Sequence, residues 1–564
     1  MTEDFRKNAP TPLAPRSFNL PTPNETVLSN GLKLIVVEDN RLPIISFRLA
    51  FKTGSANDPA DLPGLTSMIA TMINEGTEKR TSLQIASEVE NLGASLSSSA
   101  GADSTVVAAS SLAVYTNKIL DLMADVVLNP SFPDEELHLQ RDNSKQGLIA
   151  QRAQPSFLSD ERLSKVLFGE HPYSIVSATE ESLDKLTRER LEEFHRQMFV
   201  PNNAVFVAVG DVKADELKQT LENLFGGWEN GVESNNQFSA PLQRTGREIY
   251  LVDRPASAQS NIVLANLAID RSNPDYFPLL VMNQVLGAGA SSRLFMNLRE
   301  QKDFTYGAYS SIDARRSAGA FEATSEVRSS VTGDALKEFF YELDRIRDEE
   351  VPSQELQDAK NYMTGVFPIR LETQEGLINQ LVTMQMYNLP SDYLQTYRDK
   401  INEITAADVQ RVAQEYITPD KMAVVIVGDE NTIYEQIQPY AENIQLYDAQ
   451  GNQKERNKMN NDVTSGAGET WNLSVSSPQG NLPITMLLMR EGESITGTLN
   501  TPVGDGAITG GTISDNNLTA TASLSFQGMP VNVKISGTID GDSVSGSIDT
   551  GMLGSLPFTG TKAG

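Results

Sequence analysis

Hydrophobic and polar residues alternate in short segments along this chain, and longer segments with helical spacing follow them. Residues 31–39 and 44–54 alternate in this way near the start, and residues 247–254 and 260–269 do so further along. A period of two residues is typical of β-strands with one buried face. The pattern therefore predicts an α+β fold in which helices cover one face of each sheet.

An internal repeat divides most of the chain into two halves. The segment TRERLEEFHRQMFVPNNAVFVAVGD at 187–211 matches TAADVQRVAQEYITPDKMAVVIVGD at 405–429, a separation of 218 residues. A second pair, FPDEEL at 132–137 and VPSQEL at 351–356, has nearly the same separation. The coinciding residues include Thr187 and Thr405, Pro201 and Pro419, and Gly210 and Gly428. Each copy predicts a helix, a turn marked by proline and a buried strand.

These patterns predict five segments. They are an extended lead at 1–24, a first α+β half at 25–235, a second half at 245–445, a linker at 446–468 and a small all-β barrel or sandwich at 469–564. The linker is rich in Gly, Ser and Asn. The last segment has short Thr/Val/Ile-rich strands broken by Gly at roughly 8–12-residue spacing, and we find no catalytic group of residues in it.

Composition narrows the classes of function. The 564 residues carry a formal net charge of −28, which argues against a nucleic-acid-binding protein. The sequence contains no run of about 18 or more apolar residues, so it predicts no membrane span. The chain has no cysteine, which excludes thiol catalysis and Cys-zinc sites. The first residues lack the apolar core of a signal peptide, but the absence of cysteine and the C-terminal strands favour a bacterial periplasmic or secreted protein.

Several motifs, in order, resemble one family. They are LSNGLKLIVVED, PGLTSMIATMINEGT, GEHPYSIVSATEESLDKLTRERLEEFHRQMFVPNNAVFVAVGDV at 169–212 and GAGASSRLFMNLREQKDFTYGAYSS at 287–311. Over about residues 25–440 the chain is similar to the M16 (pitrilysin-like, inverzincin) peptidases. The resemblance implies two homologous α+β domains that form half of a clamshell around an unfolded peptide.

The zinc motif of that family is absent. Active members carry H-x-x-E-H on a helix, where positions i and i+4 present two imidazoles to one zinc and the Glu acts as general base. In GLTSMIATM these three positions are Ser67, Ala70 and Thr71, and the expected third ligand falls at Gln146 or Gly147. None of these side chains can take the required role. We therefore expect neither a metal nor another cofactor in this chain.

The three histidines do not replace the motif. No two of His138, His171 and His195 are four residues apart. We interpret His171, in a His-Pro-Tyr turn, as structural, and we expect His138 and His195 to be solvated on polar helix faces. Ser67 has no His or Lys near it in sequence that would activate it as a nucleophile.

The second half keeps a different part of the family's site. By position in SSRLFMNLREQKDFTYG, the resemblance implies that Arg299 and Tyr306 bind substrate and stabilise the transition state. Both can donate hydrogen bonds to a developing oxyanion. The alternative is that Arg299 makes a surface ion pair and Tyr306 lies in the core. Gly287 and Gly289 precede this motif and either contact substrate or form a turn.

The resemblance therefore implies a zinc-less subunit of a heterodimeric peptidase, in which a partner with H-x-x-E-H carries the zinc. We expect the peptide substrate to bind as an extended strand on a sheet edge. Two alternatives stay open. In the first, the chain would be a structural subunit of a larger complex, and in the second, it would be a homodimer that binds peptides without cleaving them.

Overall fold

The computed structural model describes most of the chain. The described residues are 20–231, 238–456, 468–477, 480–501, 506–526, 529–550 and 554–563. The chain divides into two compact units, Met1–Glu455 and Arg456–Gly564. The first unit contains both repeated halves, and most of the lead expected at 1–24 lies outside the described residues.

The first half builds one sheet and a layer of helices. Its strands are β1 (Asn24–Val27), β2 (Lys33–Glu38), β3 (Ile44–Phe51), β4 (Ser95–Ala100), β5 (Thr105–Leu112) and β6 (Ala204–Gly210). Its helices are α1 (Leu65–Met72), α2 (Ser82–Asn91), α3 (Thr116–Leu128), α4 (Asp134–Arg152), α5 (Pro155–Phe168), α6 (Glu180–Lys185), α7 (Arg188–Met198) and α8 (Ala214–Phe225). Helix α1 ends at Met72, four residues before Gly76.

The second half repeats this arrangement. Its strands are β7 (Glu248–Asp253), β8 (Gln259–Leu267), β9 (Thr305–Ala314), β10 (Gly319–Arg328), β11 (Ala423–Gly428), β12 (Ile444–Tyr447) and β13 (Gln453–Lys454). Its helices are α9 (Tyr276–Leu286), α10 (Arg293–Phe295), a π-helix (Met296–Gln301), α11 (Thr332–Asp348), α12 (Ser353–Glu372), α13 (Gln374–Met386), α14 (Tyr393–Glu403), α15 (Ala406–Tyr416) and α16 (Glu430–Ile437). Because β12 and β13 continue the sheet to Lys454, the linker expected at 446–468 begins later than predicted.

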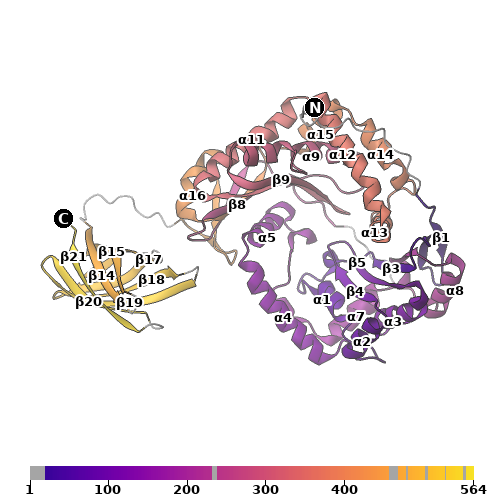
Figure 1. The fold of residues 1–564 in the computed structure, drawn as a ribbon, viewed down its shortest axis with the longest axis horizontal. Coiled ribbons are helices and arrows are strands. Elements are labelled where there is room, and N and C mark those ends of the chain that lie inside the picture. Colours follow the sequence, from indigo (N-terminus) through magenta and orange to yellow (C-terminus); the bar gives the residue numbers. More distant parts are fainter. Residues whose placement is uncertain are drawn as a thin grey trace, which may run out of the picture. The chain divides into compact units, whose positions relative to one another are not determined.

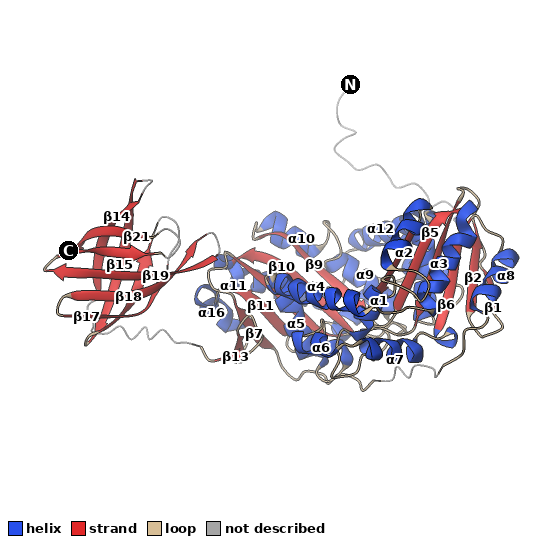
Figure 2. Cartoon of the chain, turned by 90° about the horizontal axis from the view of Figure 1, so that it is seen from below, coloured by secondary structure: helices blue, strands red, loops and turns tan. Residues whose placement is uncertain are grey.

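Strand order demonstrates the duplication. The first sheet runs β1-β2-β6-β3-β5-β4, and the second runs β13-β12-β7-β11-β8-β10-β9. The order β2-β6-β3-β5-β4 in the first sheet therefore corresponds, strand by strand, to the order β7-β11-β8-β10-β9 in the second. In each half the first of these pairs, β2 with β6 and β7 with β11, is parallel. The two halves are α+β domains of one fold, as the sequence repeat predicted (Figure 2).

The matched residues of the repeat have local structural roles. Thr187 and Thr405 are the N-caps of α7 and α15, where each side chain accepts a hydrogen bond from a backbone N–H of the first turn. Gly210 ends β6 with φ +147°, and a Cβ there would lie 2.4 Å from the carbonyl oxygen of Ile44. The repeat thus preserves helix starts and a close strand end.

Each sheet is covered on both faces, and the second cover comes from the other half of the chain. The second face of the first sheet, with Ile35 and Val207, packs against α12, α13 and α14 of the second half. The second face of the second sheet, with Val263 and Val425, packs against α5 of the first half. Figure 1 shows α5 beside the strands of the second half and α13 beside β3 and β5.

The expectation of half-buried strands covered by helices on one face was therefore wrong. Every residue of β3 after Ile44 is buried, and so are the four central residues of β2. A strand buried on both faces needs apolar residues at nearly every position, as in Ala204–Gly210. Ser46 and Arg48 are polar residues of the alternating pattern in β3, but both are buried. The polar positions of the pattern therefore do not mark an exposed face of the strand.

The C-terminal unit is a closed antiparallel barrel (Figure 2). Its strands are β14 (Glu469–Ser477), β15 (Gly480–Glu491), β16 (Ser494–Asn500), β17 (Gly506–Ser514), β18 (Asn517–Phe526), β19 (Met529–Asp540), β20 (Ser543–Asp549) and β21 (Ser555–Lys562). Pairing of β14 with β21 closes the barrel. Trp471, Met486 and Phe558 help to fill its interior with apolar side chains. This confirms the all-β unit and selects the barrel over the sandwich.

One histidine, His195, lies half-buried against aromatic side chains of the first half. The His195 ring stacks on Phe199 at 4.9 Å between centroids and lies edge-on to Phe132. Its Nε2 atom is buried without a hydrogen-bond partner among the described residues. Burial lowers the pKa of His195 to about 4. The expectation that His195 is solvated was wrong, because α7 turns this residue toward the aromatic core.

Nowhere in the described chain is a helix both long and apolar enough to cross a membrane.

The exchanged helices predict coupled unfolding of the two halves. We expect Ile378→Ala in α13, a fully buried residue on the first sheet, to destabilise the protein by about 2–5 kcal/mol. In a Trp471→Phe background, the remaining Trp228 packs on Phe51 and reports on the first half. Denaturant unfolding followed by Trp228 fluorescence should show the shift. Ile369→Ala, which is 65% exposed on α12, is the control and should change little. An unchanged Trp228 transition in Ile378→Ala would contradict the coupling.

His195 predicts a pH-dependent stability. Its pKa is lower in the folded protein than in the unfolded chain, so the unfolded chain binds more protons and the free energy of unfolding falls as pH drops from about 6.5 towards 4. The loss approaches roughly 1.4 kcal/mol per pH unit. His195→Gln removes this part, so its urea midpoint should fall less than that of the wild type between pH 7 and pH 5. Equal slopes for the two proteins would exclude His195 as the source.

Candidate functional site

Helix α1 carries the positions of the missing zinc motif. It begins after Gly64, whose φ of +94° is left-handed, and Asp58 accepts hydrogen bonds from the backbone N–H groups of Gly64 and Thr66. Burial raises the pKa of Asp58 to about 6, although these hydrogen bonds act in the opposite direction. The carboxyl group of Asp58 therefore fixes where α1 starts.

The structure brings most of the expected positions together. Ser67 and Thr71 are exposed on α1 and line one pocket of about 670 Å³ with Gly147 of α4, whereas Ala70 is buried. Of the two expected third positions, Gly147 lines this pocket and Gln146 does not. A Cβ added at Gly147 meets nothing within 4 Å, which leaves room for a side chain there.

These residues do not fit a zinc ion. Hydroxyl groups are poor zinc ligands, and neither alanine nor glycine has a ligating or basic atom. The Thr71 hydroxyl donates to the carbonyl oxygen of Ser67 at 3.1 Å instead. Among the residues that the structure describes, no group of three or more His, Cys, Asp or Glu is arranged to hold a metal ion.

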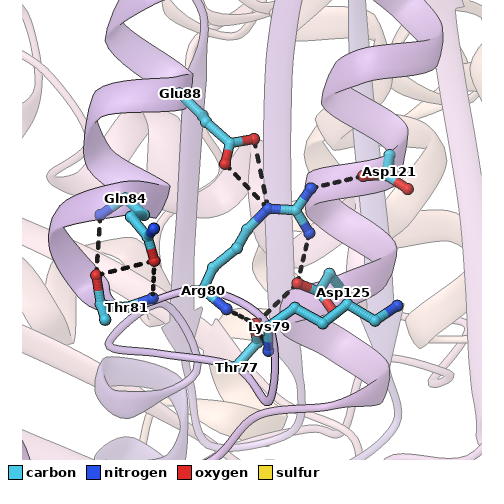
Figure 3. Close-up of polar contacts among 8 residues, drawn as sticks. All are labelled: Thr77, Lys79, Arg80, Thr81, Gln84, Glu88, Asp121 and Asp125. Carbon is cyan, nitrogen blue, oxygen red and sulfur yellow. Dashed lines mark hydrogen bonds and ion pairs between the residues drawn. The ribbon is translucent and has the colours of Figure 1, made fainter.

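An arginine holds the loop that follows α1. The Arg80 guanidinium pairs with Asp125 at 2.6 Å, Asp121 at 2.8 Å and Glu88 at 3.1 Å (Figure 3). Thr77 donates to the same Asp125 carboxylate and accepts from the backbone N–H of Arg80. Burial would raise the pKa of Asp125, but Arg80 and Thr77 lower it overall. The contacts that hold the loop after α1 are thus present, although the side chains of the zinc motif are not.

The same pocket contains carboxylates that sequence reasoning missed. Asp160 of α5 and Glu322 of β10 line it, together with the ion pair of Asp313 and Arg315 at 2.7 Å. Burial, then Asp160 and then Asp313 raise the pKa of Glu322 to about 7, and burial raises that of Asp160. These residues come from different halves. No motif connects them in the sequence, and only the packing of α5 on the second sheet brings them together.

The other two histidines have separate roles. His171 is buried, accepts from the backbone N–H of Tyr173 at 3.1 Å and lies 3.1 Å from the Ser317 hydroxyl. Burial lowers the pKa of His171. His138 is exposed and lies 3.3 Å from Asp142. These contacts agree with a structural His171 and a solvated His138.

Arg299 and Tyr306 lie together on the second half. Arg299 belongs to the π-helix, and Tyr306 belongs to β9, the edge strand of the second sheet. The guanidinium carbon lies 5.9 Å from the centre of the Tyr306 ring. Arg299 also pairs with Asp303 at 3.6 Å, so the surface ion pair exists, but Tyr306 is 86% exposed and not in the core.

The π-helix is anchored from behind. The side-chain amide of Asn297 donates to Glu342 at 2.8 Å and to Glu338 at 3.1 Å, both on α11. The turn after the helix passes through Asp303 at φ +54°, a left-handed conformation uncommon outside glycine, and its carbonyl oxygen accepts from Arg328. The ends of this segment fix the backbone that carries Arg299. Single π-turns are frequent at functional sites.

The glycine-rich loop has a structural explanation at one position. The backbone N–H of Ser310 in β9 donates to the carbonyl oxygen of Gly287 at 2.9 Å, and a Cβ on Gly287 would lie 2.3 Å from that nitrogen. Gly287 therefore lets the loop cover the middle of the β9 edge. Gly289 has only an ordinary contact with Gln284, so the structure gives no reason for glycine there.

Comparison with known proteins gives one consistent result. The family described as "Insulinase (Peptidase family M16)" matches residues 34–178, and the family described as "Peptidase M16 inactive domain" matches residues 185–363. Together the two matches span more than half of the chain. The first contains α1, and the second contains Arg299 and Tyr306.

Curated relatives agree with these matches. The chain is 24% identical over 407 residues to an uncharacterized zinc protease of Mycobacterium leprae, covering 71% of this chain and 91% of that protein. It is 22% identical over 413 residues to the uncharacterized zinc protease YmxG of Bacillus subtilis, covering 70% and 96%. It is also 22% identical over 407 residues to the non-peptidase homolog YmxG of Helicobacter pylori, covering 70% and 91%.

Solved structures share the fold. A peptidase M16 inactive domain from Pseudomonas fluorescens is 28% identical, with a TM-score of 0.69 over 72% of this chain and 98% of that chain. A Helicobacter pylori protease is similar in fold, with 20% identity and a TM-score of 0.68 over 72% of this chain and all of that chain. The repeated halves, the strand order and these matches together show that this chain is a member of the M16 peptidase family.

Proposed function

We propose that this chain is the zinc-less subunit of a two-chain M16 peptidase. The observation that carries the proposal is the exposure of Tyr306, 86%, beside Arg299 on an edge strand. A large aromatic side chain left in water gains no burial energy, so its position makes sense if it contacts something outside the chain. The α1 pocket supports the same proposal, because Ser67, Ala70, Thr71 and Gly147, at the positions of the family's zinc motif, supply neither a zinc ligand nor a general base.

The proposed chemistry divides between two chains. The guanidinium of Arg299 and the phenol of Tyr306 donate hydrogen bonds to the oxyanion that develops on the scissile carbonyl. The zinc of the partner polarises that carbonyl and activates the attacking water. The π-helix anchored by Asn297 keeps Arg299 in place before the substrate arrives.

An extended peptide fits a sheet edge of this chain. Strand β4 is one edge of the first sheet and packs beside α1, and among the described residues it pairs with β5 alone. The edge of β9 is partly covered by the Gly287 loop. We therefore assign the substrate strand to β4, where addition of a strand satisfies free backbone groups.

Two relatives support a non-catalytic role by their names. The Helicobacter pylori relative is called a non-peptidase homolog, and the Pseudomonas fluorescens structure is called an inactive domain. A structural subunit and a peptide-binding homodimer are the competing functions, and the experiment below separates them. A periplasmic or secreted location stays a prediction.

The composite site predicts that activity needs both chains. The H-x-x-E-H protein encoded nearest to this chain should cleave a quenched unstructured peptide only when mixed with it. Arg299→Ala and Tyr306→Phe should each lower kcat/KM of the mixture about tenfold or more, which corresponds to roughly 1.4 kcal/mol of barrier, because each removes a donor to the transition state.

Matched controls are Tyr362→Phe, an exposed tyrosine on α12, and Arg196→Ala, an exposed arginine on α7. Neither should change the rate. If the chain ignores the zinc protein, or if Arg299 and Tyr306 variants behave like these controls, the proposal fails. Self-association with peptide affinity would then favour the homodimer, and assembly into a large complex would favour the structural subunit.

The α1 pocket predicts that zinc binding can be restored. The wild-type chain should bind no Zn²⁺ after gel filtration. The variant Ser67→His, Thr71→His, Gly147→Glu places two imidazoles at i and i+4 opposite a carboxylate, and should retain about one Zn²⁺ per chain. Metal content by mass spectrometry is the measurement. The control lacks Gly147→Glu and should bind more weakly. A folded triple variant without zinc would show that α1 and α4 are not arranged as described.

A further inference from the structure

A second pocket lies behind the π-helix, between that helix, α11 and the start of α12. Its volume is about 550 Å³. We propose that this pocket binds a small tetrahedral oxyanion, with inorganic phosphate as the best match. The proposal concerns this chain alone and does not depend on a zinc-bearing partner.

The charges of the pocket differ from those of the whole protein. The chain carries 46 basic and 74 acidic residues, whereas basic side chains outnumber acidic ones in this pocket. The basic residues are Arg293, Lys302, Lys337 and Arg345, and the acidic residues are Glu338, Glu342 and Glu355. An acidic protein repels anions over most of its surface, so a local excess of cations marks a place where an anion is accepted.

One of the four cations that line the pocket has no ion pair among the described residues. Lys302 pairs with Glu338 at 3.1 Å, and Arg345 pairs with Glu342 at 3.4 Å. Lys337 is exposed on α11 and has no ion pair within the described part of the chain. Glu355 pairs with Arg293, so each of the three carboxylates of the pocket has a cationic partner, although Arg345 is shared with Glu349 outside the pocket. Lys337 is available to a ligand.

Arg293 provides a buried donor without an acceptor. Its side chain is only 4% exposed, and its Nε and Nη2 atoms donate to the Glu355 carboxylate at 2.8 Å each. The remaining Nη1 is buried without a hydrogen-bond partner among the described residues. An unpaired buried donor on a charged group is costly, and an oxyanion in the pocket supplies the acceptor that the protein does not.

Asn297 provides a buried acceptor without a donor. Its amide nitrogen faces two carboxylates, Glu338 and Glu342, which can only accept, so the orientation of the amide is fixed. The Oδ1 atom therefore points elsewhere, and it is buried without a partner in the described structure. A ligand that satisfies both Arg293 and Asn297 needs acceptor oxygens and one O–H group.

Phosphate meets this requirement near neutral pH. Its monohydrogen form offers three acceptor oxygens to Arg293 and Lys337 and one P–O–H group to Asn297 Oδ1. Sulfate has the same shape but no proton to donate. The geometry therefore predicts that phosphate binds more tightly than sulfate, and that both bind more tightly than chloride.

The experiment is titration calorimetry of the full chain with sodium phosphate, sodium sulfate and sodium chloride at pH 7.5 and constant ionic strength. Lys337→Gln should weaken phosphate binding about fivefold, because one charged contact is lost. Arg293→Lys keeps a cation beside Glu355 but removes Nη1, and should weaken binding about tenfold or more. Lys421→Gln, at an exposed lysine of the same half with no ion pair in the described chain, is the control and should bind like the wild type.

The outcomes are distinct. Saturable phosphate binding that is stronger than sulfate binding and sensitive to Lys337→Gln supports the site. No heat of binding, or equal effects of phosphate and chloride, would mean that the pocket holds only water and would overturn it. Because Arg293→Lys could disturb folding, its circular dichroism is compared with the wild type. Unchanged affinity in folded Lys337→Gln would also overturn the proposal.

Discussion

Burial of both faces of each sheet is the constraint on which this fold depends. Each half covers one face of its sheet with its own helices, but the other face is apolar and is covered by helices from the opposite half. The helices involved, α5 and α13, occupy equivalent places in the repeat: α5 begins at Pro155 and α13 at Gln374, 219 residues apart, as are Pro133 and Pro352. Without this exchange, the second, apolar face of each sheet would be exposed to water.

The exchange also builds the pocket beside α1. Helix α4 places Gly147 opposite Ser67 and Thr71, and α5, which follows it, places Asp160 next to Glu322 of the second half. The pocket therefore has walls from both halves. Its shape does not depend on zinc-motif side chains, because residues such as Met68 and Leu163 that line it also belong to the core. The family's architecture is therefore present here although the residues of its zinc motif are not.

Much of the fold could be predicted from the sequence, for reasons that can be traced to particular residues. Thr187 and Thr405 cap equivalent helices, and Gly210 ends a strand at a close contact, so these residues mark the repeat. The zinc-site positions on α1 could be located because the motif spacing is local. The apolar stripe of α13 predicts that it is covered, but a stripe does not say which sheet covers it.

The features that the sequence did not reveal all depend on contacts between distant segments. His195 lies on a helix whose composition is polar, and only its contacts with Phe132 and Phe199 show that its ring packs against the core. Asp160 and Glu322 are 162 residues apart and meet across the two halves. The exposure of Tyr306 could not be read from its strand, because the pattern of β9 does not say which of its residues other segments cover.

The exchanged helices bear on how such a chain could have arisen. A single copy of the repeat, about half the length of the first unit, would fold into a sheet with one bare apolar face and a helix with nothing beneath it. Two identical copies could solve both problems by trading that helix, which is domain swapping between protomers. The exchange seen here is the same arrangement within one chain, so each half depends on the other to cover one face of its sheet.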